Sequence, residues 1–205
     1  DPLPGIDDTN AVTFNFNTGE QRVSLLYAPS QPVWVSRPGS MLTAPGGDQM
    51  DIVSWNATPS ILPGETYQVE AALNNPTIEE LRAAGTEYPK WVTDKYLQLP
   101  ENFSQPIRSL ALEITANAET PYDQAFAITQ YLRTNIKYSP TIPTAPRGTD
   151  RLEWILFEHK QAYCVYYASA EILMLRTLGI PARMAVGFSQ GTGTTPGEGF
   201  AGEVE

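Results

Sequence analysis

The residue with the most reactive side chain in this sequence is Cys164, the chain's single cysteine. It precedes residues 165–178, which are apolar almost all round and are followed by Gly179 and, two residues later, Pro181. This pattern predicts a helix that is buried on most sides and ends at the glycine. The free N–H groups and the dipole of a helix N-terminus favour a thiolate and can donate to an oxyanion. From its position alone, Cys164 is either a nucleophile or a small core residue.

A thiol nucleophile needs a base, and the chain has one histidine, His159, five residues before Cys164. We expect His159 to be a turn or surface residue rather than this base, because the base must lie beside the sulfur and be held by a carboxylate. Gln161 is a candidate side-chain donor to an oxyanion, with a solvent-facing turn residue as the alternative. Tyr163 and Tyr166 are candidates for lining a substrate cleft.

The same residues exclude several other kinds of site. One cysteine forms no internal disulfide, and a cysteine-based zinc site would need more ligands, so we expect neither a metal nor a cofactor. A thiol redox sensor is disfavoured because there is no second cysteine to resolve the oxidised thiol. The net charge is -10, from 13 basic and 23 acidic residues, and no basic cluster occurs, so nucleic acid is not an expected partner.

The segment 162–188, AYCVYYASAEILMLRTLGIPARMAVGF, resembles the core of transglutaminase-like proteins, particularly the bacterial membrane-anchored subfamily. The similarity extends over about residues 86–190 and favours the nucleophile role of Cys164. Where the family usually has glycine two residues before the cysteine, this chain has Ala162, whose methyl group we expect to narrow the mouth of the site slightly. The matching positions are Cys164, Tyr167-Ala168, Leu175-Arg176, 179–183 and Gly187-Phe188.

The resemblance implies a papain-like core in which the cysteine works with a histidine and an aspartate that follow it. The sequence has no histidine after Cys164. We therefore expect this chain to be a truncated core with little activity, the triad partners and the membrane anchors belonging to a longer parent protein.

The implied reaction is acyl transfer or amide hydrolysis through a Cys164 thioester. The acyl donor would be a glutamine side chain or another amide of a protein or peptide, and the acceptor an amine or water. The implied protein is therefore a transglutaminase-like acyltransferase or a thiol protease or amidase. The implied location is extracytoplasmic, in a bacterial membrane protein at the periplasm or cell surface. The alternative is a non-catalytic scaffold or binding module of the cell envelope.

The rest of the chain predicts an α+β fold with an N-terminal all-β region at residues 1–76. Alternating apolar residues between Pro- and Gly-rich turns predict short strands. The role of this region is open, with a structural or docking role as the default. The strands are expected at 12–16, 22–28, 31–36, 51–57 and 65–73.

Helices are expected after the strands. Thr77 and Glu80 predict a capped short helix at the start of a connector, residues 77–103. Residues 104–205 are expected to form the partial core, in which Thr120-Pro121 and Asp150 mark two further helix starts.

Two further expectations concern the cysteine helix and the residues after it. Arg176 and Arg183 are expected to be structural, bonding carbonyls or carboxylates. Residues 182–188 alternate in the manner of a strand. That strand would leave an exposed sheet edge, so we expect self-association through it or disorder in the tail from Gly191 onward.

Overall fold

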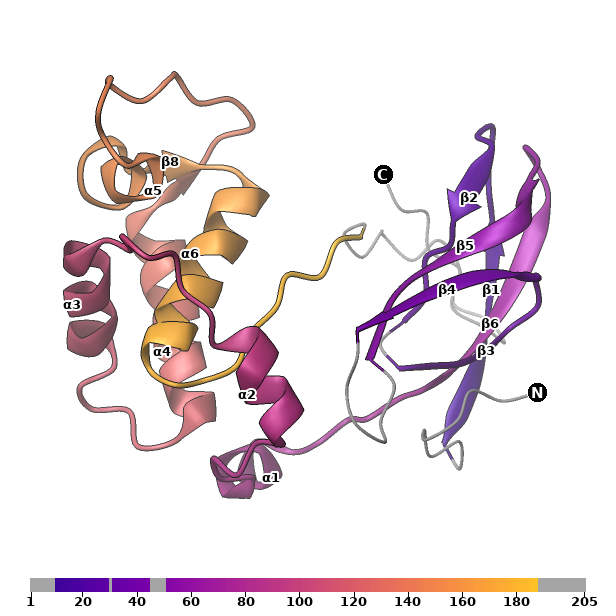
Figure 1. Ribbon diagram of the computed structural model, residues 1–205, viewed down its shortest axis with the longest axis horizontal. Helices are drawn as coiled ribbons and strands as arrows, with labels where there is room; N and C mark the ends of the chain where they lie inside the picture. The colour runs from indigo at the N-terminus through magenta and orange to yellow at the C-terminus, as the bar shows by residue number, and fades with distance from the viewer. Residues whose placement is uncertain (1–9, 30, 45–50, 188–205) are drawn as a thin grey trace.

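The computed structural model describes residues 10–29, 31–44 and 51–187. Strands occupy the N-terminal part of this range and helices the remainder, so the α+β prediction is confirmed (Figure 1). Figure 1 shows the strands of residues 11–72 gathered at one end of the molecule and the helices, with two short strands among them, at the other. The chain crosses between them just before the first helix.

The N-terminal region consists of two three-stranded antiparallel sheets, with strand orders β1-β6-β3 and β2-β5-β4. They enclose a small core of Leu26, Ala57, Ile61, Tyr67 and Val69. Five of the six strands fall where apolar alternation predicts them. The strand bounds are β1 Ala11–Asn17, β2 Val23–Leu25, β3 Pro32–Val35, β4 Gly39–Ala44, β5 Asp51–Ile61 and β6 Thr66–Ala72.

The C-terminal region is built on helices that start where the sequence predicts a cap. Thr77 and Glu80 form a capping box, and Thr120 and Asp150 each accept a backbone N–H of the first turn. Part of the expected connector is helical, because residues 90–96 form α2. The helices are α1 Ile78–Ala83, α2 Lys90–Tyr96, α3 Gln105–Ile114, α4 Pro121–Asn135, α5 Arg151–Trp154, the π-helix η1 Ile155–His159 and α6 Cys164–Thr177.

Helix α6 packs against α3 and α4, and these three helices supply much of a second core. A short parallel pair, β7 Lys137–Tyr138 and β8 Gln161–Ala162, lies at the start of α6. The buried side chains that line the interior are Ile107, Leu110, Ala111, Ile128, Leu132, Ile136, Ile155, Leu156, Ala162, Ala170 and Met174.

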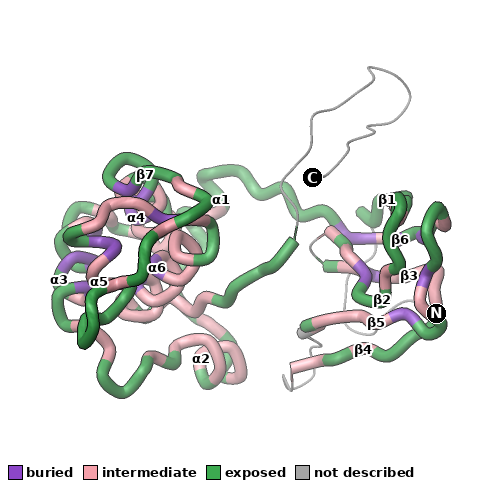
Figure 2. The backbone as a smooth tube through the Cα atoms, turned by 90° about the horizontal axis from the view of Figure 1, so that it is seen from above, coloured by how far each residue is buried: buried purple, intermediate pink, exposed green. Residues whose placement is uncertain are grey.

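Two expectations about α6 and the chain after it are wrong. Only Ala170 and Met174 of α6 are fully buried, the other residues of 166–178 are partly buried, and Val165 at the helix start is 47% exposed (Figure 2). Residues 182–187 form no strand, since alternation alone does not supply the ladder of hydrogen bonds that a strand needs. The edge expected to drive self-association is thus absent from the described residues, and Phe188 and the tail from Gly191 lie outside them.

The end of α6 follows the sequence prediction closely. Gly179 has φ +79°, and the N–H groups of Gly179 and Ile180 donate to the carbonyls of Arg176 and Leu175. This pair of backbone hydrogen bonds is a Schellman motif, in which glycine is the usual residue at the left-handed position. Across the described ranges, no helix is long and apolar enough to cross a membrane.

Candidate active site at the start of helix α6

Cys164 is the first residue of α6, and its side chain is exposed. The residue before it, Tyr163, has extended backbone angles (φ -111°, ψ 174°) and makes no side-chain capping bond to the helix. The Tyr166 N–H donates to the carbonyl of Tyr163 at 2.9 Å, which leaves the N–H groups of Cys164 and Val165 for an anion that lies over the helix start. This excludes a buried core role for Cys164 and places the thiol where a helix stabilises negative charge.

The backbone that leads to Cys164 is held by several features. Lys160 adopts the left-handed conformation (φ 57°, ψ 25°), and its N–H donates to the carbonyl of Ile155 at 2.9 Å, which closes η1. The next residues form β8, flanked by hydrogen bonds from Lys137 N to Lys160 O and from Ser139 N to Ala162 O, both 2.8 Å. The chain thus enters α6 from a fixed strand.

Ala162 does not narrow the mouth of the site as expected. It is 2% exposed and belongs to the helical core. Its methyl group therefore packs inward beneath the strand that precedes Cys164.

Tyr163 and Tyr166 lie together on either side of Cys164 in sequence. Their rings meet edge to face, with centroids 4.8 Å apart. The hydrogen bond with Tyr166 is the largest cause that raises the pKa of Tyr163, ahead of desolvation. The pair is half-buried, so it can offer an aromatic wall beside the thiol. Its contact with substrate stays a prediction.

Arg151, which sequence reasoning did not select, joins this pair. Its Nη1 donates to the Tyr166 hydroxyl at 2.9 Å, and the guanidinium carbon lies 5.8 Å from the centroid of the Tyr166 ring. Arg151 opens α5, next to the cap residue Asp150. Only the predicted helix start could have drawn attention to it, because its spacing of 13 residues from Cys164 matches no motif.

His159 is not the turn or surface residue that its position suggested. It lies within η1, half-buried, with its ring stacked on Trp154 at 4.4 Å between centroids and 12° between planes. Its Nε2 is buried without a hydrogen-bond partner. Among the described residues, no hydrogen bond joins it to Cys164, and the expectation that it is not the base stays a prediction.

Gln161 lies on β8, half-buried, three residues before Cys164. Its role as an oxyanion donor stays a prediction.

Two hydrogen bonds connect α6 to neighbouring segments. The Tyr167 hydroxyl donates to the carbonyl of Ile136, and Thr129 donates to Glu171 at 2.5 Å. These bonds fix α6 against α4 and the chain that follows it.

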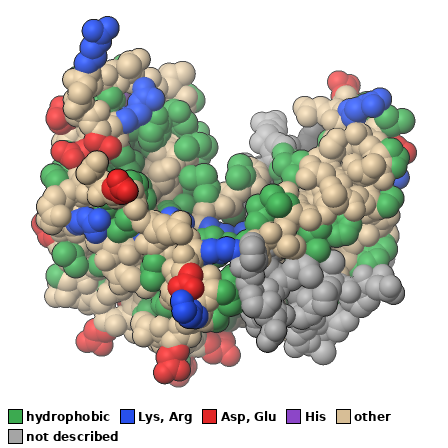
Figure 3. Space-filling model, in the orientation of Figure 1, with side chains coloured by type: hydrophobic (Ala, Val, Ile, Leu, Met, Phe, Trp, Pro, Cys, Tyr) green, Lys and Arg blue, Asp and Glu red, His purple; other side chains and the backbone are tan. Residues whose placement is uncertain are grey.

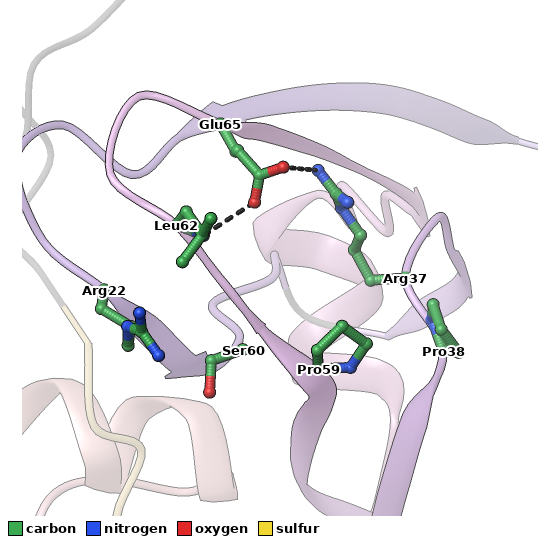
Figure 4. Close-up of a pocket in the computed structure, with 7 residues that line it drawn as sticks. All are labelled: Arg22, Arg37, Pro38, Pro59, Ser60, Leu62 and Glu65. Atoms are coloured by element: carbon green, nitrogen blue, oxygen red, sulfur yellow. Dashed lines mark hydrogen bonds and ion pairs between the residues drawn. The ribbon is translucent and has the colours of Figure 1, made fainter.

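Two cavities of the structure have linings that do not include Cys164. One of about 270 Å³ lies in the β region, lined by residues that include Arg22, Arg37 and Glu65 (Figure 4). The other, of about 410 Å³, lies beside α3 and α4 and includes Arg82 and Asp123. Within the described residues, no group of histidine, cysteine or acidic side chains could hold a metal. On the face shown in Figure 3, basic side chains are scattered among acidic ones.

Comparison with known proteins agrees with this site. Residues 108–204 match the family model of the transglutaminase-like superfamily. The chain is 35% identical over 101 residues to the uncharacterized protein YebA of Bacillus subtilis (strain 168), covering 48% of this chain and 14% of that protein. It is 30% identical over 95 residues to a protein-glutamine gamma-glutamyltransferase of Pseudomonas aeruginosa (strain PAO1), covering 46% of this chain and again 14% of the relative. The matched segment is thus a small part of each curated relative.

A solved structure extends the similarity to the β region. The periplasmic domain of TgpA from Pseudomonas aeruginosa has a TM-score of 0.63 and 20% sequence identity, covering 94% of this chain and 63% of that one. At this identity the match shows a shared fold, with an N-terminal sheet region followed by helices. Together with this shared fold, the family match over residues 108–204 supports a transglutaminase-like core in that part of the chain.

Proposed function

We propose that Cys164 is the nucleophile of an acyl-transfer reaction. The thiolate attacks the carbonyl carbon of a glutamine side chain or another amide, the C–N bond breaks, and the nitrogen leaves as ammonia or an amine with the proton taken from the thiol. An amine or water then attacks the thioester and releases Cys164. The observation that carries the proposal is an exposed thiol at an uncapped helix N-terminus, where N–H groups can stabilise the developing oxyanion.

The base in this proposal is a histidine that the 205 residues do not contain. His159 is stacked on Trp154 with Nε2 buried, which supports leaving it out of this role. We therefore expect the reaction to need the full-length gene product, and this chain by itself to be almost inactive. The names of the Pseudomonas relatives, a protein-glutamine gamma-glutamyltransferase and a periplasmic domain, support a protein or peptide amide substrate and an extracytoplasmic location. That the parent is a bacterial membrane protein is part of the proposal and rests on the sequence resemblance.

The test is capture of the thioester. The full-length protein, incubated with a glutamine peptide, should form an adduct at Cys164 that hydroxylamine removes, and an amine should raise turnover if the protein is a transferase rather than a hydrolase. The variant Cys164→Ala should form none, and His159→Gln should react within about threefold of the wild type, a difference below 1 kcal/mol in barrier. Acyl transfer that survives in Cys164→Ala would overturn the proposal.

The second candidate is a non-catalytic scaffold, and the same proteins separate it from the enzyme. If the full-length protein forms no adduct, and its thiol reacts with iodoacetamide with an apparent pKa near the free value of about 8.5, Cys164 is not activated. If the full-length protein titrates well below that value and the 205-residue chain does not, the activating base lies outside this chain.

A further inference from the structure

We propose that Arg151 makes the approach to Cys164 selective for acyl donors that carry a negative charge next to the reactive amide. The inference rests on the proposed function and deepens it by naming a substrate class. It concerns which donor reaches the thiol and adds no chemical step to the reaction. Arg151 is thus a specificity residue rather than part of the reacting centre.

The first argument is the place of the guanidinium. Arg151 is held on Tyr166 by one hydrogen bond of 2.9 Å and by its position 5.8 Å from the ring centroid. Tyr166 lies two residues after Cys164, in the first turn of α6. The charge is therefore held near the start of the helix, on a side chain that remains exposed to solvent.

The second argument links the same charge to the thiol. The Tyr163 ring, directly before Cys164, meets the Tyr166 ring edge to face at 4.8 Å, and Tyr166 in turn accepts from Arg151. Tyr163, Tyr166 and Arg151 thus form one cluster at the start of α6, where Cys164 is the first residue. A donor that enters along this cluster meets two aromatic edges and one cation.

The third argument is that the charge of Arg151 is not neutralised. Two other arginines, Arg37 and Arg82, face a carboxylate at 4.0 Å and 2.9 Å. No carboxylate lies within 4.0 Å of the Arg151 guanidinium in the described ranges.

The acidic residues nearest in sequence are engaged elsewhere. Asp150 accepts the N–H of Glu153 at 2.8 Å, and Glu153 accepts the hydroxyl of Ser104 at 2.5 Å. A cation without a carboxylate partner near an exposed nucleophile favours an anionic ligand, even in a chain of net charge -10.

The expected effect is modest, because Arg151 is exposed and water screens its charge. Unit charges separated by several ångströms in water change a rate by about two- to threefold at low salt, and the effect fades when the Debye length falls to about 3 Å. A comparison of paired reagents can resolve a factor of this size, since shared influences on the thiol cancel.

The experiment measures alkylation of Cys164 by iodoacetate, which is anionic, and by iodoacetamide, which is neutral. The rate with iodoacetate divided by the rate with iodoacetamide reports the local electrostatic potential at the thiol. This measurement needs no catalytic activity. In Arg151→Gln the ratio should fall about two- to threefold at low ionic strength and by almost nothing in 1 M salt. Arg22→Gln, the same charge change in the β region, should leave the ratio unchanged, and Arg151→Lys should keep most of it. An unchanged ratio in Arg151→Gln with native circular dichroism overturns the inference.

A second measurement separates this inference from the proposed function. The full-length protein is assayed with two glutamine peptides that differ only by glutamate or glutamine beside the reactive residue, and kcat/KM should favour the glutamate peptide in the wild type but not in Arg151→Gln. If the alkylation ratio responds but neither peptide is acylated, the proposed function fails and the electrostatic role stands. If both peptides react equally in both proteins and the ratio does not respond, the selectivity of Arg151 is wrong and the proposed function stands.

Discussion

Arg176 shows how a single side chain of the family motif supports the site. Its Nε and Nη2 donate to the carbonyl of Ala182 at 2.9 Å and 2.6 Å, and its Nη1 donates to the carbonyl of Gln98 at 2.8 Å. The sequence predicts a structural role in bonding carbonyls, and these contacts confirm it. The two carbonyls belong to segments that also bond each other, since the Ala182 N–H donates to the carbonyl of Tyr96 at 3.1 Å. Arg176 therefore ties the end of α6 to the chain after α2 and to the chain after Gly179.

We expect Arg176→Gln to destabilise the helical region by about 2 kcal/mol, since three charged hydrogen bonds are lost and two carbonyls lose a donor. Arg176→Lys should recover little of this, because an ammonium cannot reproduce the planar fork. The urea midpoint, followed by circular dichroism, measures both. Arg133→Gln, on the exposed side of α4, serves as the control and should change stability by less than about 0.5 kcal/mol. Equal shifts of the urea midpoint in Arg176→Gln and Arg133→Gln would contradict the role of Arg176.

At the site itself, the sequence identifies Cys164 but not its surroundings. A single cysteine before an apolar run that ends in Gly179 can be recognised from the sequence, because helix ends have strong local signals. The contact of Arg151 with Tyr166 depends on how α5 packs beside α6, and no local pattern encodes that. The stacking of His159 on Trp154 is likewise a tertiary contact, so its burial could not be read from the sequence.

At the scale of elements, capping residues predict helix starts well because one side chain satisfies N–H groups within its own turn. Thr77, Thr120 and Asp150 all do so. The π-helix η1 and the left-handed conformation of Lys160 were not predicted. Both lie directly before β8, whose pairing with β7 is a tertiary contact that no local pattern encodes. Strand β4 was also missed, because Gly39–Ala44 has no apolar alternation and is held by pairing with β5.

The start of α4 offers a test through pH. Asp123 accepts from Arg82 of α1, at 3.0 Å from Nε, and from the Thr120 hydroxyl at 2.7 Å. These bonds, with Arg82 the larger cause, lower the pKa of the Asp123 carboxyl below its ordinary value. Its stabilising contribution is therefore present above the unfolded-state pKa of about 3.9 and is lost as the pH falls through the lower folded-state value.

We expect Asp123→Asn to lower the melting temperature by about 1–3 °C at pH 7, because the pair is exposed and screened by solvent. The difference between wild type and variant should stay constant from pH 7 to about pH 5 and narrow below about pH 4. Thermal melts across this range measure it. Glu119→Gln, an exposed neighbour, should show no such narrowing. A difference that grows as the pH falls would mean that the carboxyl is stabilised in its protonated form instead.

At the scale of the whole molecule, the two cores are separate. One lies between the sheets around Val69 and the other among the helices around Ile128, and each well-packed pair of elements lies within one region. The segment after α6 runs from the helices toward the sheets (Figure 1). The division of the chain into residues 1–76, 77–103 and 104–205 stays a prediction, since the shared fold of the TgpA domain spans both regions without dividing them.

Two matched substitutions test whether the regions unfold independently. Ile61→Ala and Ile128→Ala remove the same atoms from sites that are 1% and 0% exposed, so each should cost about 2–5 kcal/mol. With independent regions, native-state hydrogen exchange should show lost protection in the strands only for Ile61→Ala, and in α3, α4 and α6 only for Ile128→Ala. If either variant lowers protection in both regions equally, the chain is one cooperative unit. The rate of Cys164 alkylation gives the functional counterpart. It should be unchanged in Ile61→Ala, because α6 and the residues that hold its N-terminus draw their support from the helical core alone.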